Sequence, residues 1–223
     1  MQGLWLASFA AGLLLQLSVI RALSQRAWRE FFLVFVYVIA MLLASVAQAA
    51  SFFSFGTPAG SPLHYAAYYW ITDGILQVLV LGVVLSLVRR SAERRPAGIV
   101  TSRALAASAL IVALVSFAAY GDRNLNTRMS LVARNIGFLA VLANLVLWAF
   151  LIRRRHPDRT VLLLSGGLGV EMAGKAIGHS LRTLAPSLVT VGNLVIVISY
   201  LFGLYVWWQA FRHWQPDPPP LSG

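Results

Sequence analysis

Residues 160–181 read TVLLLSGGLGVEMAGKAIGHSL, an apolar stretch that carries the charged residues Glu171 and Lys175. The stretch is long enough to cross a bilayer as one helix, because a hydrocarbon core of about 30 Å needs roughly 20 mostly apolar residues. Glu171, Lys175 and His179 follow one another at intervals of four, so they share one helix face. The stretch therefore predicts a membrane-spanning helix with an inward-facing polar stripe.

The composition extends this interpretation to the whole chain. Of the 223 residues, 59% are apolar and 11% are charged, whereas soluble domains have roughly 45–50% and about 25%. The chain contains no cysteine, so it is not a disulfide-stapled secreted module, and it is too apolar for a disordered protein. We expect an integral protein of the plasma membrane.

Seven segments are long and apolar enough to span the bilayer. They run from Leu4 to Ile20, Phe31 to Ala49, Pro62 to Val88, Ala104 to Tyr120, Met129 to Ile152, Thr160 to Leu181 and Leu188 to Trp208. Backbone amides in lipid must be bonded within their own segment, which requires helices here. The sequence predicts an all-α, single-domain polytopic membrane protein over residues 1–208, with a Pro-rich cytoplasmic tail at 209–223.

The basic residues predict the orientation of these spans. Thirteen arginines lie in one alternating set of loops and the C-terminal tail, and three in the other set. Because short loops rich in Lys and Arg stay in the cytoplasm, we expect the N-terminus outside and the C-terminus inside. The net charge of +11 then reflects topology and attraction to anionic lipid headgroups, not nucleic-acid binding.

Charged residues within spans are costly and mark functional sites by default. Seven polar residues form the predicted ligand-binding set: Asp73, Arg134, Asn135, Glu171, Lys175, His179 and Asn193. Glu171 and Lys175 have the favoured order for a pair within one helix, and Arg134 is the expected cation for Asp73. Two interpretations stay open: an outward-opening polar pocket in the outer half of the membrane, or ion pairs that only lock the bundle.

Small residues accompany the polar stripe in the sixth segment. They are Gly166, Gly167, Gly169, Gly174 and Gly178. Glycines at such spacing let neighbouring helices approach closely. We therefore expect this helix to be central, with the Ala-rich fourth segment as a candidate neighbour.

Metal and cofactor chemistry finds no support in the sequence. The four histidines are scattered over both predicted faces of the membrane, and there is no cysteine, nucleophile elbow or phosphate-binding loop. The topology is similar to that of the retinal-binding rhodopsins, but the last span holds no lysine for a chromophore. We expect neither a metal nor a cofactor.

The run Tyr68-Tyr69-Trp70, the pair Arg134-Asn135 and the Gly-rich sixth segment resemble a family of uncharacterised bacterial seven-helix integral membrane proteins. The resemblance implies the span layout and no particular activity.

The function that these features favour is non-enzymatic: a receptor-like or carrier module that binds a small ligand in the polar pocket. The alternative is an accessory or scaffolding subunit that docks a membrane-protein partner through residues 51–70 and the basic loops. A third interpretation, an enzyme that acts on lipid, is supported only by the clustered polar residues.

Overall fold

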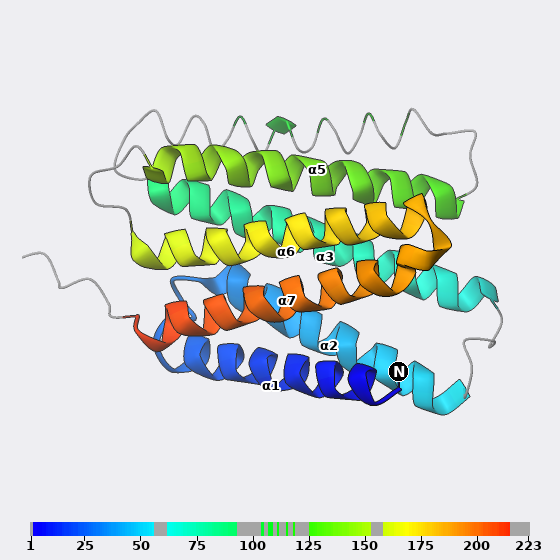
Figure 1. Ribbon diagram of the computed structural model, residues 1–223. Helices are drawn as coiled ribbons and strands as arrows, with labels where there is room; N and C mark the ends of the chain where they lie inside the picture. The colour runs from blue at the N-terminus through cyan, green and yellow to red at the C-terminus, as the bar shows by residue number, and fades with distance from the viewer. Residues whose placement is uncertain are drawn as a thin grey trace, which may run out of the picture. The chain divides into compact units, whose positions relative to one another are not determined.

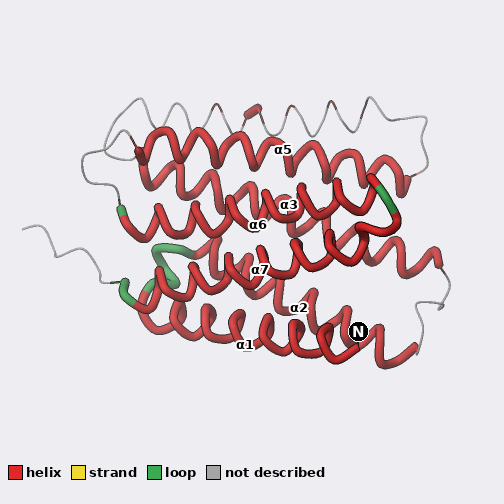
Figure 2. The backbone as a smooth tube through the Cα atoms, viewed as in Figure 1, coloured by secondary structure: helices red, strands yellow, loops and turns green. Residues whose placement is uncertain are grey.

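The computed structural model describes residues 2–55, 62–92, 125–152 and 158–214, together with positions 104, 107, 108, 111, 115 and 118. All regular structure in these residues is helical, as Figures 1 and 2 show. The helices are α1 (Gln2–Arg26), α2 (Phe32–Phe55), α3 (Pro62–Ala92), α5 (Leu125–Ile152), α6 (Arg159–Leu184), the 3-10 turn η1 (Pro186–Leu188) and α7 (Val189–Arg212). Apart from those six positions, the predicted fourth span, Ala104 to Tyr120, lies outside the described residues.

Five of the described helices are long and apolar enough to cross a membrane. Their apolar windows are Leu6–Gln25, Thr72–Ser91, Asn135–Ile152, Arg159–Arg182 and Val189–Arg212, and α2 contributes the shorter stretch Phe32–Ala47. Large apolar side chains face outward along them, among them Leu14 at 66%, Phe138 at 63% and Ile152 at 70% exposure. The all-helical class is thus confirmed. The exposed apolar surface is typical of contact with lipid, which is consistent with a membrane protein.

The helices extend beyond the predicted apolar spans. Helix α1 continues past Ile20 to Arg26, and α7 continues past Trp208 to Arg212. Helical hydrogen bonds do not require an apolar side chain, so the helix persists where the residues become polar. A hydropathy boundary therefore indicates where the hydrocarbon ends and not where the helix ends.

The chain divides into two compact units, Met1–Val38 with Leu162–Gly223 and Ile39–Val161. The first unit holds α1, the start of α2, most of α6 and α7. The second holds the rest of α2 together with α3 and α5.

Within the first unit, α6 packs closely on α7 through small residues. A Cβ atom on Gly178 would lie 2.6 Å from the Gly192 carbonyl oxygen, and one on Gly167 would lie 3.0 Å from that of Gly203. A Cβ on Gly174 would overlap the Ser199 side chain. The predicted close approach along α6 is thus confirmed, with α7 as its neighbour.

Aromatic side chains fill the same unit toward the C-terminal end of α7. Tyr37 packs edge-on against Trp207 at 5.8 Å between ring centroids, and Phe31 meets Phe211 at 5.4 Å. The Trp207 indole N–H donates a 2.9 Å hydrogen bond to the Leu164 carbonyl oxygen. These contacts attach α2 and α6 to α7 within the unit.

Helices α1 and α7 are parallel neighbours (Figure 1). Gly12 and Gln16 contact Tyr200, and further along α1 Arg21 shares a cavity with Arg212. Residue numbers thus rise together on the two helices. Their C-terminal ends point the same way.

In the second unit, α3 and α5 pack together and run in the same direction, as α1 and α7 do in the first unit (Figure 1). Gln77 lies against Gly137, whose added Cβ would be 3.2 Å from the Gln77 Oε1. Near the C-terminal end of α3, Arg90 Nε lies 3.5 Å from a carboxylate oxygen of Asp158, the residue before α6. Figure 1 shows α3 and α5 running in the same direction, so they are also parallel.

Candidate functional site

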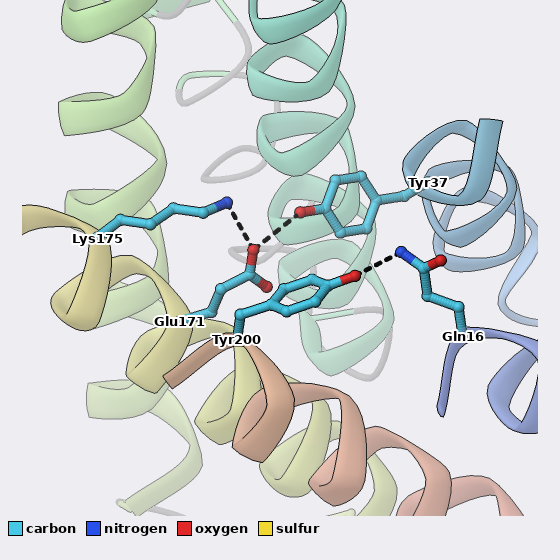
Figure 3. A network of polar contacts seen from close by, with 5 residues as sticks. All are labelled: Gln16, Tyr37, Glu171, Lys175 and Tyr200. Atoms are coloured by element: carbon cyan, nitrogen blue, oxygen red, sulfur yellow. Dashed lines mark hydrogen bonds and ion pairs between the residues drawn. The ribbon is translucent and has the colours of Figure 1, made fainter. Parts of the chain in front are cut away.

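Five polar side chains from four helices meet in the first unit, and we call them the polar cluster. They are Gln16 of α1, Tyr37 of α2, Glu171 and Lys175 of α6, and Tyr200 of α7 (Figure 3). All five belong to helices that the apolar contacts described above hold together. The cluster is therefore built on rigid elements and not on loops.

Glu171 and Lys175 form the ionic part of the polar cluster. The Lys175 Nζ lies 2.6 Å from the Glu171 Oε1, which confirms the pair predicted from their spacing. The two side chains differ in exposure, 5% for Glu171 and 40% for Lys175. The carboxylate is thus buried, and its ammonium partner reaches the surface of the described protein.

Tyr37 also approaches the carboxylate. Its hydroxyl donates to the same Glu171 Oε1 at 3.4 Å, long for a hydrogen bond of this type. Tyr37 is itself buried at 1% exposure. The Glu171 oxygen therefore receives one strong, charged contact and one weaker, neutral contact.

Gln16 and Tyr200 form the second part of the cluster. The Gln16 side-chain amide donates to the Tyr200 hydroxyl oxygen, and Gln16 has 0% exposure. Figure 3 shows the Tyr200 hydroxyl pointing toward Gln16 of α1. The bond ties α1 to α7 through polar atoms that would otherwise be costly to bury.

Two members of the polar cluster lie near the middle of their helices. Glu171 is at the midpoint of α6, and Tyr200 is close to the midpoint of α7. The sequence interpretation included Glu171 and Lys175 but missed Gln16, Tyr37 and Tyr200. Gln16 had a detectable signal, an amide between two leucines of a span, whereas tyrosines are ambiguous in apolar segments.

The remaining part of the polar stripe is not interior. His179 is exposed on α6, as is Asn193 on α7. The prediction that the whole stripe faces inward is therefore correct at Glu171 and wrong at His179. The reason is that the last turns of α6 meet α7 through Gly178 and Gly192, so His179, the next residue after Gly178, lies off that contact.

The other predicted site residues belong to the second unit. Asp73 and Asn135 are half-buried on α3 and α5, while the Arg134 side chain lies outside the described residues. Gln77 of α3 lies beside Gly137 of α5. Because the two helices are parallel, Asp73, one turn before Gln77, is level with the α5 backbone one turn before Gly137, next to Arg134. The Asp73–Arg134 ion pair stays a prediction that this register favours.

Within the part of the chain that the structure describes, no three His, Cys, Asp or Glu side chains gather as a metal site requires. The polar cluster instead offers a half-exposed cation beside hydroxyl and amide groups. Charged and hydrogen-bonding side chains of these kinds are the groups that orient polar ligands in protein sites.

Comparison of the chain with models of protein families, with curated proteins and with solved structures finds no match.

Proposed function

We propose that this chain is a seven-span protein of the plasma membrane that binds a small polar ligand at the polar cluster, as a receptor-like or carrier module. In this proposal the N-terminus is outside and the C-terminus is in the cytoplasm. Of the predicted ligand-binding residues in the first unit, Glu171 and Lys175 belong to this site. In the proposed topology, His179 and Asn193 lie between the site and the outer face of the membrane.

The two parallel helix pairs support seven spans. Neighbouring helices that run the same way across a membrane require an odd number of crossings between them along the chain. We infer an odd number of crossings between α3 and α5, and the sequence predicts one span there. If α2, α3, α5 and α6 each cross the membrane, the parallel pair α1–α7 supports a fifth crossing between them.

The observation that carries the ligand proposal is the unequal burial of the ion pair. Because Glu171 is buried and Lys175 is 40% exposed, an incoming molecule meets the ammonium first. A carboxylate on that molecule forms a charge-assisted hydrogen bond with Lys175, and the neighbouring carboxylate disfavours a ligand with excess negative charge. Small zwitterions and monocarboxylates fit this pattern best.

Lys175 is the only lysine in the sequence, which makes the site directly testable. In membranes, a water-soluble amine-reactive reagent should modify Lys175, identified by peptide mass spectrometry. A panel of amino acids and C2 to C6 monocarboxylates at millimolar concentration should contain compounds that slow this reaction. The same compounds should raise the unfolding temperature of the purified protein, because a ligand that binds only the folded state stabilises it.

The substitution Lys175→Met should abolish the stabilisation by those compounds, and Arg182→Met on the same helix should leave it unchanged. Full retention in Lys175→Met would refute the ligand site. A panel without any effect, together with purification as a stable assembly with another membrane protein, would favour the accessory-subunit alternative.

A further inference from the structure

A second polar site lies between α1 and α7, at the C-terminal end of both helices. A cavity of about 330 Å³ opens there, lined by Ser18, Arg21 and Gln25 of α1 and by Trp208, Phe211 and Arg212 of α7. The three α1 residues recur at intervals of three and four, and on α7 Phe211 and Arg212 follow Trp208 by three and four, so each helix contributes one face. The volume is at the lower end of those of small-molecule sites.

The lining of this cavity is strongly cationic. It includes two guanidinium groups, and no acidic residue is among the side chains that line it. The Ser18 hydroxyl donates to the Leu14 carbonyl oxygen at 2.7 Å, so the donors suited to an anion are those of Arg21, Arg212 and the Gln25 amide. Guanidinium forks match the oxygens of a phosphate.

One of the two arginines is held in place. The Arg212 Cζ lies 5.1 Å from the ring centroid of Trp208, within the range of a cation–π contact. Trp208 is only half-buried, while the next turn places Phe211 in the core at 0% exposure. Stacking restricts the guanidinium before any ligand arrives, which lowers the entropy cost of binding.

The location suits a lipid headgroup. On the proposed topology, which this inference depends on, both helices end at the cytoplasmic leaflet, where anionic lipids are abundant and basic pockets between helices bind their headgroups. A tryptophan and a basic side chain at the end of a span are typical of headgroup depth.

We infer that this cavity binds the phosphodiester headgroup of an anionic phospholipid of the cytoplasmic leaflet. Arg21 and Arg212 hold the phosphate oxygens, Gln25 donates to the polar headgroup, and the acyl chains lie along the exposed apolar surface of α1, which includes Leu14 and Leu17.

Native mass spectrometry of the purified full chain tests the inference with phosphatidylglycerol and phosphatidylcholine of identical acyl chains. The wild type should bind phosphatidylglycerol more tightly. The double variant Arg21→Gln/Arg212→Gln should bind it about 10- to 30-fold more weakly, the effect of removing two arginines that contact an anionic lipid. Arg29→Gln/Arg159→Gln has the same net charge outside the cavity and should bind like the wild type; each single variant at Arg21 and Arg212 should give an intermediate loss.

Three results would overturn the inference: equal losses in the two double variants, wild-type binding by Arg21→Gln/Arg212→Gln, or displacement of the lipid by millimolar inorganic phosphate, which would indicate a site for the free anion. Labelling of a Ser24→Cys variant reports separately on which side of the membrane α1 ends. A failure of the topology is therefore distinguishable from a failure of this site.

Discussion

Glu171 is a carboxylate near the middle of a helix that is long and apolar enough to span a membrane, a position where an ion without a partner would be expensive. Its neighbours explain how it is tolerated, since Lys175 supplies a charge at 2.6 Å and Tyr37 a hydroxyl at 3.4 Å. Ion pairs of this kind contribute little net stability, because desolvation offsets most of their attraction. Removing one partner of such a pair is nevertheless destabilising, because the other charge is left buried without a partner.

That asymmetry predicts the outcome of a double-mutant cycle at Glu171 and Lys175. Lys175→Met should destabilise the protein by about 1–3 kcal/mol, less than the 3–5 kcal/mol typical of a fully buried pair because Lys175 is partly exposed. Glu171→Gln/Lys175→Met should recover much of that loss. Reversible unfolding in mixed micelles measures all four proteins, and strictly additive effects would contradict the coupling.

The bond between Gln16 and Tyr200 allows a second test with a control inside the same helix. Tyr200→Phe removes the hydroxyl that accepts from a fully buried amide and should cost about 1–3 kcal/mol. Tyr205→Phe removes a hydroxyl that accepts from Gln209 in an exposed pair and should cost less than about 0.5 kcal/mol. Equal effects in the same unfolding assay would mean that the buried bond contributes nothing specific.

These residues show what the sequence contains and what it does not. Glu171 and Lys175 are partners on one helix, so their four-residue spacing is sufficient to pair them. Gln16 and Tyr200 are separated by 184 positions, and their contact depends on which helices become neighbours. Helical periodicity carries no information about that choice.

At the scale of the element, the distinctive feature of α6 is the glycine-lined face that it packs against α7. Gly167, Gly174 and Gly178 face α7, where Gly192, Gly203 and Ser199 receive them. Lipid is as apolar as a leucine side chain, so helices in a membrane gain from close packing more than from burying apolar area. The glycines predicted a close neighbour for α6 but could not identify α7, because small residues also occur in the fourth segment.

The closest approach of α6 to the backbone of α7 should be sensitive to a single methyl group. Gly178→Ala places a Cβ 2.6 Å from the Gly192 carbonyl oxygen, so the helices must separate, at a cost of about 1–3 kcal/mol. Gly74→Ala on α3 is the control, since nothing lies within 4 Å of its added Cβ. That change should be neutral or stabilising by up to roughly 1 kcal/mol, because alanine is the better helix former. Unfolding of Gly178→Ala at the wild-type midpoint would contradict the α6–α7 packing.

At the scale of the whole molecule, helix direction carries information that hydropathy does not. The sequence predicts each span separately, and the count could be wrong by one without any local conflict. A chain that alternates across a membrane makes neighbours parallel only after an odd number of intervening crossings, so the parallel pairs α1–α7 and α3–α5 support the proposed seven spans. The arginine distribution supports the proposed orientation.

Two conservative substitutions test count and orientation together, since the chain has no cysteine of its own. Ser24 is exposed near the end of α1 and Ser187 is exposed in η1 before α7, so Ser24→Cys and Ser187→Cys report on sites separated by every crossing from α2 to α6. With an odd number of crossings they lie on opposite sides. In intact cells a membrane-impermeant maleimide should label the cysteine at 187 and not the one at 24, and inverted vesicles should give the reverse. Labelling of both from one side would refute the odd count, while an exchanged pattern would keep the count and refute the orientation that the arginines predict.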